Sequence, residues 1–148
     1  MNKITLFFFV STLFISCSQP EKELPKSNEI MLIDGWARPG KAGMMSAAYF
    51  KLKNNTGSPD TVLNILSDAS KNTQMHLSFK TDDGLMSMKQ QQFVAIPSKS
   101  EIEFKQGGLH VMIIQPDRDL VEGDSISLRL FLSSSKELVA KVPVKSVN

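Results

Sequence analysis

Cysteine is almost missing from this chain: among 148 residues, Cys17 stands alone. It directly follows an apolar segment at the N-terminus, so we expect it to lie outside the folded domain. A domain without a thiol forms no disulfide and offers no thiolate ligand or cysteine nucleophile. A blue-copper electron carrier is excluded on the same ground, because its copper site requires a cysteine thiolate beside two histidines.

An excess of either charge is also missing, since 17 Lys and Arg residues stand against 15 Asp and Glu residues. This balance gives no sign of a surface that binds nucleic-acid phosphates. No Ser-His-Asp arrangement and no pair of catalytic carboxylates stands out, so we expect a protein that is not an enzyme. The length of the chain leaves room for one domain.

The N-terminus has the features of an export signal. Lys3 precedes an apolar run, Ile4 to Ile15, which is too short to span a bilayer. The segment Phe14-Ile15-Ser16-Cys17 resembles a lipobox, the cleavage motif of bacterial lipoproteins. The resemblance implies a signal peptide at residues 1–16 and a diacylated Cys17. Two or more acyl chains anchor a protein stably, at roughly 0.8 kcal/mol per buried methylene.

An ordinary signal peptide, cut near Cys17 without lipidation, is the alternative. With the lipid, the chain would be a membrane-anchored lipoprotein of the bacterial cell envelope, facing the periplasm or the cell exterior. Residues 17–28 would hold the lipidated cysteine and a flexible tether, because this segment is polar, charged and contains two prolines. Residues 29–148 would form the domain.

The domain shows short apolar or alternating runs separated by turn residues such as Asp82-Asp83-Gly84. No segment keeps a helical period over three turns. The pattern predicts an all-β fold, an antiparallel β-sandwich with Greek-key connections. The expected strands are Ile30–Ala37, Ala47–Lys53, Thr61–Leu66, Thr73–Lys80, Leu85–Lys89, Lys99–Phe104, His110–Ile114, Ser125–Leu132 and Leu138–Val144.

Both histidines of the chain lie in two segments that also hold four of its eight methionines. The first segment runs from Met75-His76 to Met86-Ser87-Met88, and the second is Gly107-Gly108-Leu109-His110-Val111-Met112. Imidazole nitrogen and thioether sulfur suit monovalent copper, whereas calcium and magnesium prefer oxygen ligands. The sequence therefore points to a copper-binding module that holds Cu(I). A zinc site is disfavoured, because methionine is a poor zinc ligand and no cysteine completes the set.

Strand parity refines this prediction. Side chains two residues apart on a strand share a face, so His110 and Met112 point the same way. The turn at 82–84 would fold the strand with Met86 and Met88 back against the strand with His76. Four donors can then converge on one patch. Met75 should face the opposite side of its strand.

The chain resembles the periplasmic PCu(A)C copper-chaperone family over most of the domain, from about Ile33 to Val144. The resemblance rests on Trp36-Ala37-Arg38-Pro39-Gly40, on the segment from Ala47 to Asn54, and on the glycine-led segment that ends in His110-x-Met112. In the family motif a His is followed about ten residues on by a Met. Twenty-one residues then precede His-x-Met, and here residues 89–109 separate Met88 from His110.

The resemblance implies a cupredoxin-like fold and Cu(I) ligands at His76, Met88, His110 and Met112. Eleven residues rather than about ten separate His76 from Met88, which leaves Met86 as an alternate ligand. Met75, next to His76, is a further alternate. The family delivers copper to the binuclear centre of cytochrome c oxidase, so a copper-accepting protein, either an oxidase subunit or a thiol-bearing assembly factor, is the implied partner.

The competing hypothesis is a non-metal surface lipoprotein that binds a protein or a glycan. It predicts that His76 and His110 lie far apart, whereas the copper hypothesis predicts that their imidazoles approach a common point.

Overall fold

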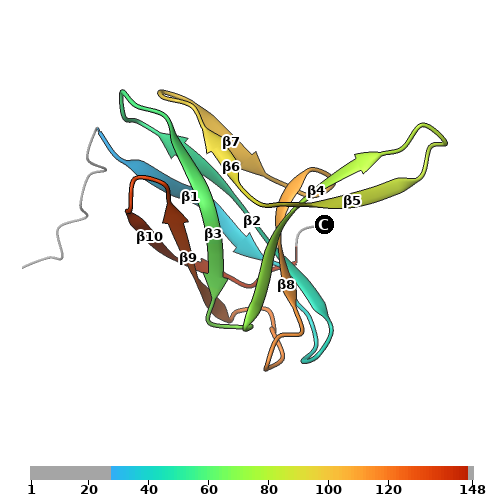
Figure 1. Ribbon diagram of the computed structural model, residues 1–148. Coiled ribbons are helices and arrows are strands. Elements are labelled where there is room, and N and C mark those ends of the chain that lie inside the picture. The colour runs from blue at the N-terminus through green and yellow to red at the C-terminus, as the bar shows by residue number, and fades with distance from the viewer. Residues whose placement is uncertain (1–27, 147–148) are drawn as a thin grey trace, which may run out of the picture.

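The computed structural model describes residues 28–146, which form two antiparallel β-sheets packed face to face (Figure 1). These residues contain no helix, and so none that is long and apolar enough to cross a membrane. The strands are β1 (Ile30–Ala37), β2 (Met45–Asn54), β3 (Asp60–Ser67), β4 (Asn72–Lys80), β5 (Met86–Gln91), β6 (Val94–Ile96), β7 (Glu101–Phe104), β8 (Leu109–Ile114), β9 (Ser125–Leu132) and β10 (Glu137–Pro143).

The strand order confirms the all-β sandwich expected from the sequence. One sheet has the order β1-β2-β8-β4-β5, with β7 also paired to β2. The other has the order β10-β9-β3-β6. Strand β8 lies between β2 and β4, and β9 lies between β10 and β3, so the chain crosses between the sheets in the Greek-key manner.

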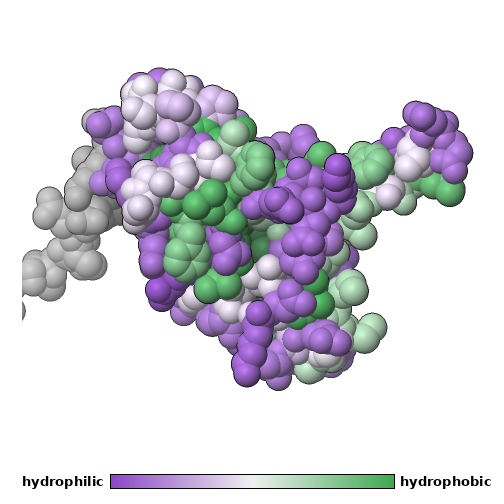
Figure 2. Space-filling view, in the orientation of Figure 1, coloured by the Kyte–Doolittle hydropathy of each residue, from purple (hydrophilic) through white to green (hydrophobic). Residues whose placement is uncertain are grey.

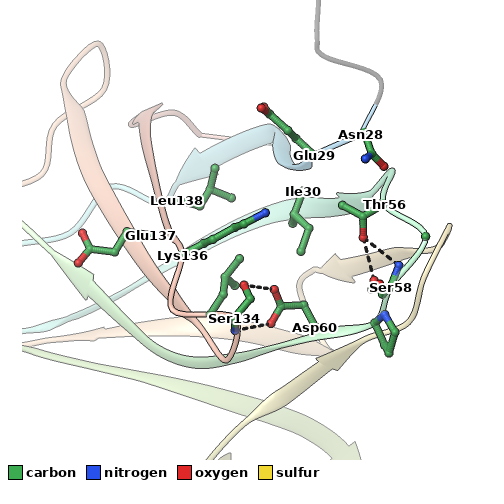
Figure 3. Close-up of a pocket in the computed structure, with 13 residues that line it drawn as sticks. Asn28, Glu29, Ile30, Thr56, Ser58, Asp60, Ser134, Lys136, Glu137 and Leu138 are labelled. Carbon is green, nitrogen blue, oxygen red and sulfur yellow. Dashed lines mark hydrogen bonds between the residues drawn. The ribbon is translucent and has the colours of Figure 1, made fainter.

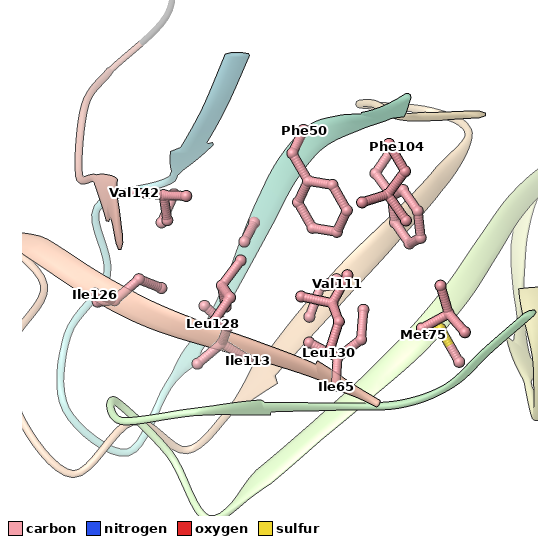
Figure 4. Close-up of a cluster of buried hydrophobic side chains, with 14 of the residues drawn as sticks. Phe50, Ile65, Met75, Phe104, Val111, Ile113, Ile126, Leu128, Leu130 and Val142 are labelled. Carbon is pink, nitrogen blue, oxygen red and sulfur yellow. The ribbon is translucent and has the colours of Figure 1, made fainter. Parts of the chain in front are cut away.

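The core lies between the inner faces of the two sheets (Figure 4). Strand β9 shows why its sequence forms such a layer: Ile126, Leu128 and Leu130 are buried at alternate positions, as the period of two in a strand requires. Phe50 and Phe104 stack with ring centroids 4.3 Å apart. Burying one such side chain contributes about 1.5–3 kcal/mol. This core makes the sheet that carries the histidines a rigid platform.

The hairpin formed by β4 and β5 projects from the body of the sandwich (Figures 1 and 2). Its turn follows the predicted chemistry, since Gly84 has a φ of 87° and the Thr81 amide donates to the Leu85 carbonyl at 2.8 Å. Leu77 and Phe79 remain 40% and 41% exposed, because the second sheet does not extend under this part of β4.

The structure departs from the sequence prediction at β6 and at the start of β7. The run that forms β6, Val94–Ile96, has three residues and ends at Pro97, too short for a periodic signal. The strand predicted from Lys99 begins at Glu101, because Lys99 has a φ of 53° and lies in a turn. The predicted signal peptide, Cys17 and nearly all of the predicted tether lie outside the described residues.

Candidate metal centre

The two histidines lie directly opposite each other on neighbouring strands. The β4–β8 register pairs His76 with His110, and their ring centroids are 5.9 Å apart with planes at 58°. Both side chains are on the outer face of the larger sheet, because Met75 and Val111, the residues next to them, are buried in the core. Met112 lies two residues along β8 from His110 and shares this outer face.

The two methionines of the β4–β5 hairpin, Met86 and Met88, follow one another along the same outer face of the sheet. Met88 pairs with Ser78, two residues from His76 on β4, so Met88 is a diagonal neighbour of His76. Diagonal neighbours on one face remain within reach of long side chains. Met86 pairs with Lys80 and lies one further step toward the hairpin tip. Met88 is therefore the nearer thioether.

Met75 occupies a different position from the other methionines. It pairs with Val111 and is 4% exposed. Figure 4 shows it among the core side chains near Val111 and Leu130. Its thioether lies on the inner face, with the sheet between it and the two imidazoles.

The backbone fixes the ring of His110. His110 Nδ1 lies 2.9 Å from the carbonyl oxygen of Gly108. A carbonyl only accepts, so Nδ1 carries the hydrogen and Nε2 keeps its lone pair. The same carbonyl accepts from the Ser78 amide at 3.0 Å, which ties β4 to the turn before β8. Gly107, with a φ of 71°, allows this turn.

A side chain rather than the backbone fixes the ring of His76. Its Nε2 lies 2.9 Å from Gln74 Oε1, while its Nδ1 is buried without a hydrogen-bond partner. If Nε2 donates to the amide oxygen, the lone pair is on Nδ1. A buried polar atom without a partner is costly, and a bound metal would satisfy it. Burial, and then the charge of His110, lower the pKa of His76, so it stays neutral to lower pH than an exposed histidine.

Aromatic rings cover the other side of His110. The ring of Tyr49, on β2, lies 6.5 Å from that of His110, and the ring of Trp36 lies 4.5 Å from Tyr49. Burial raises the pKa of the Tyr49 phenol, and this keeps it neutral. Neither the position of these two rings beside His110 nor the role of Gln74 was predicted from the sequence. Parity could have revealed Gln74, which is two residues from His76 on one strand.

Access to the centre differs between its two ends. His110 and Met112 are 5% and 9% exposed, and His76 is half-buried. Met88 is 55% exposed. The candidate ligands thus range from a buried pair on β8, His110 and Met112, to an exposed thioether on the hairpin, that of Met88. Within residues 28–146 no group of three or more His, Cys, Asp or Glu residues is placed to hold a metal.

A cavity of about 600 Å³ lies elsewhere, at the end of the sandwich where β1 begins (Figure 3). Its lining includes Thr56, Asp60 and Ser134. The Asp60 carboxylate accepts from the Ser134 hydroxyl at 2.6 Å and from the Ser133 hydroxyl at 2.7 Å, so it is occupied within the fold. The histidines are not among the residues that line this cavity.

Solved structures of PCuAC domains share this architecture. The copper-bound PCuAC domain from PmoF2 matches with a TM-score of 0.67 and 17% identity, over 82% of this chain and 97% of that domain. The apo PCuAC domain from PmoF1 matches with a TM-score of 0.66 and 19% identity, over 82% and 98% of the two chains. The solution structure of CuI-DR1885 from Deinococcus radiodurans matches with a TM-score of 0.59 and 20% identity, over 84% and 81%. The fold is thus the cupredoxin-like sandwich of PCuAC domains, as the sequence resemblance implied.

The chain belongs to the family described as "Putative lipoprotein LpqE-like", whose model matches residues 30–144. It is similar to the "Putative lipoprotein Lxx21020" of Leifsonia xyli subsp. xyli (strain CTCB07), at 27% identity over 88% of this chain and 76% of that protein. It is also similar to the "Uncharacterized protein RP573" of Rickettsia prowazekii (strain Madrid E), at 27% identity over 93% of this chain and 78% of that protein.

Proposed function

We propose that this protein is an extracytoplasmic copper chaperone that binds Cu(I) through His76, Met88, His110 and Met112 and passes it to a partner protein. One observation carries the proposal: the two imidazoles lie opposite each other on the outer face of the sheet, 5.9 Å apart, with Met112 beside them. The hypothesis of a non-metal surface lipoprotein predicted two distant histidines. The neighbours in the structural comparison support copper, since two of them are named as copper-bound.

The donor chemistry suits Cu(I) rather than Cu(II) or zinc. Two neutral imidazoles and two neutral thioethers leave the +1 charge of the ion unchanged, and soft thioethers favour the monovalent state. The hydrogen bonds indicate that His110 would bind through Nε2 and His76 through Nδ1. Met88 is the preferred hairpin ligand, because the register places Met86 one step further away.

The difference in exposure between the donors suits transfer. No substrate bond is broken: a partner donor displaces one copper ligand at a time, and the exposed Met88 is the first that a partner can reach. Such a protein would act without being an enzyme. With a diacylated Cys17 it would stand on a membrane of the cell envelope, and its acceptor would be a copper protein such as a cytochrome c oxidase subunit or a thiol-bearing assembly factor.

The test is Cu(I) affinity of residues 18–148, which contain all ten strands, measured under reducing, oxygen-free conditions by competition with a chromophoric chelator. The wild type should hold one equivalent tightly, and His76→Ala, His110→Ala and Met112→Leu should each weaken it. Met31→Leu is the matched control, since Met31 lies on β1 against Asn55. Failure of the wild type to compete would refute the proposal.

A further inference from the structure

A further exposed thioether, that of Met45, lies on the same outer face, on the side away from the hairpin. In the β2–β8 register Met45 pairs with Ile114, and Ala47 pairs with Met112. Met45 is therefore a diagonal neighbour of Met112, as Met88 is of His76, and such neighbours are within reach of long side chains. Met45 is 59% exposed, and the residue between it and Tyr49 on this face is the small Ala47.

The backbone holds Met45 in this position firmly. The loop before β2 is attached to the segment after β8, because the Gly43 amide donates to the Pro116 carbonyl at 2.9 Å and the Gln115 amide donates to the Met44 carbonyl at 2.9 Å. Lys41 and Asp119 add an ion pair at 2.8 Å. The exposed thioether is thus presented by ordered backbone hydrogen bonds and a register fixed by strand pairing.

We propose that Met45 is a fifth Cu(I) ligand, which forms an alternate coordination set with His110 and Met112. This inference rests on the proposed function. The buried pair on β8 would remain bound in both sets while the exposed ligands change. As the bonds from copper to Met88 Sδ and to His76 Nδ1 break, a bond from copper to Met45 Sδ forms, the copper remains +1, and no proton or electron moves.

The two sets differ in the number of ligands that they offer. The first set has two imidazoles and two thioethers, whereas the alternate set has one imidazole and two thioethers. Copper would therefore rest toward His76 and Met88 and pass toward Met45 when a partner withdraws it. The chaperone would then have two edges at which a partner can reach the ion.

The first test is Ag(I), a redox-inert soft monovalent ion, titrated into residues 18–148 with ¹³C-methyl-labelled methionine and followed by NMR. We expect the Met45 methyl signal to move along the same titration curve as that of Met112. The Met44 signal should not move in parallel, because Met44, 64% exposed, precedes β2 and lies outside the β2–β8 register that makes Met45 a diagonal neighbour of Met112. A Met45 signal that stays fixed while those of Met112 and Met88 move would overturn this inference and leave the proposed function intact. Fixed signals for all three would refute both.

The second test is a double-mutant cycle of Met45→Leu and Met88→Leu, with Cu(I) affinity as the readout. If each thioether substitutes for the other, the variants are not additive, and the double variant should lose on the order of tenfold more affinity than the two single losses predict. Met44→Leu in the Met88→Leu background is the matched control and should add nothing. Additive losses for Met45 and Met88 would overturn the inference.

Discussion

Replacing Gln74 by leucine tests how the fold prepares His76 for a metal. The change removes the acceptor that lies 2.9 Å from His76 Nε2 while keeping a side chain of similar size opposite Met112. Without the amide, nothing fixes the lone pair of His76 on the buried Nδ1. Partners that orient a metal ligand are worth about 10–100-fold in metal affinity. We therefore expect Cu(I) affinity to fall by that factor, or about 1.4–2.7 kcal/mol.

Chelator competition would measure the affinity, and ¹⁵N NMR of the histidine rings would report which nitrogen carries the hydrogen. Gln74→Glu restores an oxygen acceptor and should recover most of the affinity. Gln91→Leu is the matched control, because its amide donates to the Lys89 carbonyl and its side chain belongs to the opposite face. A Gln74→Leu variant with unchanged affinity and unchanged ring nitrogens would refute the reasoning.

The other predictions concern pH, the core and Gly35 of β1, which lies where the register with β2 shifts between Ile33 and Trp36. Because the pKa of His76 is lowered in the fold from 6.5, the unfolded chain binds more protons, so apoprotein stability should fall as pH drops below about 6.5 toward the folded pKa. Urea unfolding between about pH 5 and 8, the range in which histidines usually titrate, would show this dependence of stability on pH. His76→Gln should flatten it. Met75→Leu, inside the core, should cost less than about 1.5 kcal/mol and leave Cu(I) affinity unchanged, whereas an affinity loss like that of Met112→Leu would contradict the assigned faces. Gly35→Ala should cost about 1–3 kcal/mol in denaturant unfolding, because the added Cβ would lie 2.5 Å from Val142 Cγ1; unaltered stability would contradict this close approach.

Turn residues and alternation predicted most of the sandwich, because both act locally. The strands Ile30–Ala37 and Ser125–Leu132 agree at both ends with β1 and β9. Strand β6 was missed because three residues between a turn and a proline carry no period. Its position depends on pairing with β3, a contact made at long range in the sequence.

The sequence likewise predicted one part of the candidate site and not the other. Parity predicted that His110 and Met112 share a face and that Met75 faces away, since both follow from positions along one strand. The register between strands was beyond the sequence, and the register is what sets His76 opposite His110 and Met88 closer than Met86. The hydrogen bond that Gln74 Oε1 accepts from His76 also depends on a rotamer that packing selects.

The most direct test of the central claim is X-ray absorption at the copper K-edge of residues 18–148 loaded with one equivalent of Cu(I). We expect a +1 edge and a first shell with both imidazole nitrogen and thioether sulfur, and a loss of sulfur scattering in the Met88→Leu/Met112→Leu variant. A first shell of nitrogen and oxygen alone in the wild type would contradict it.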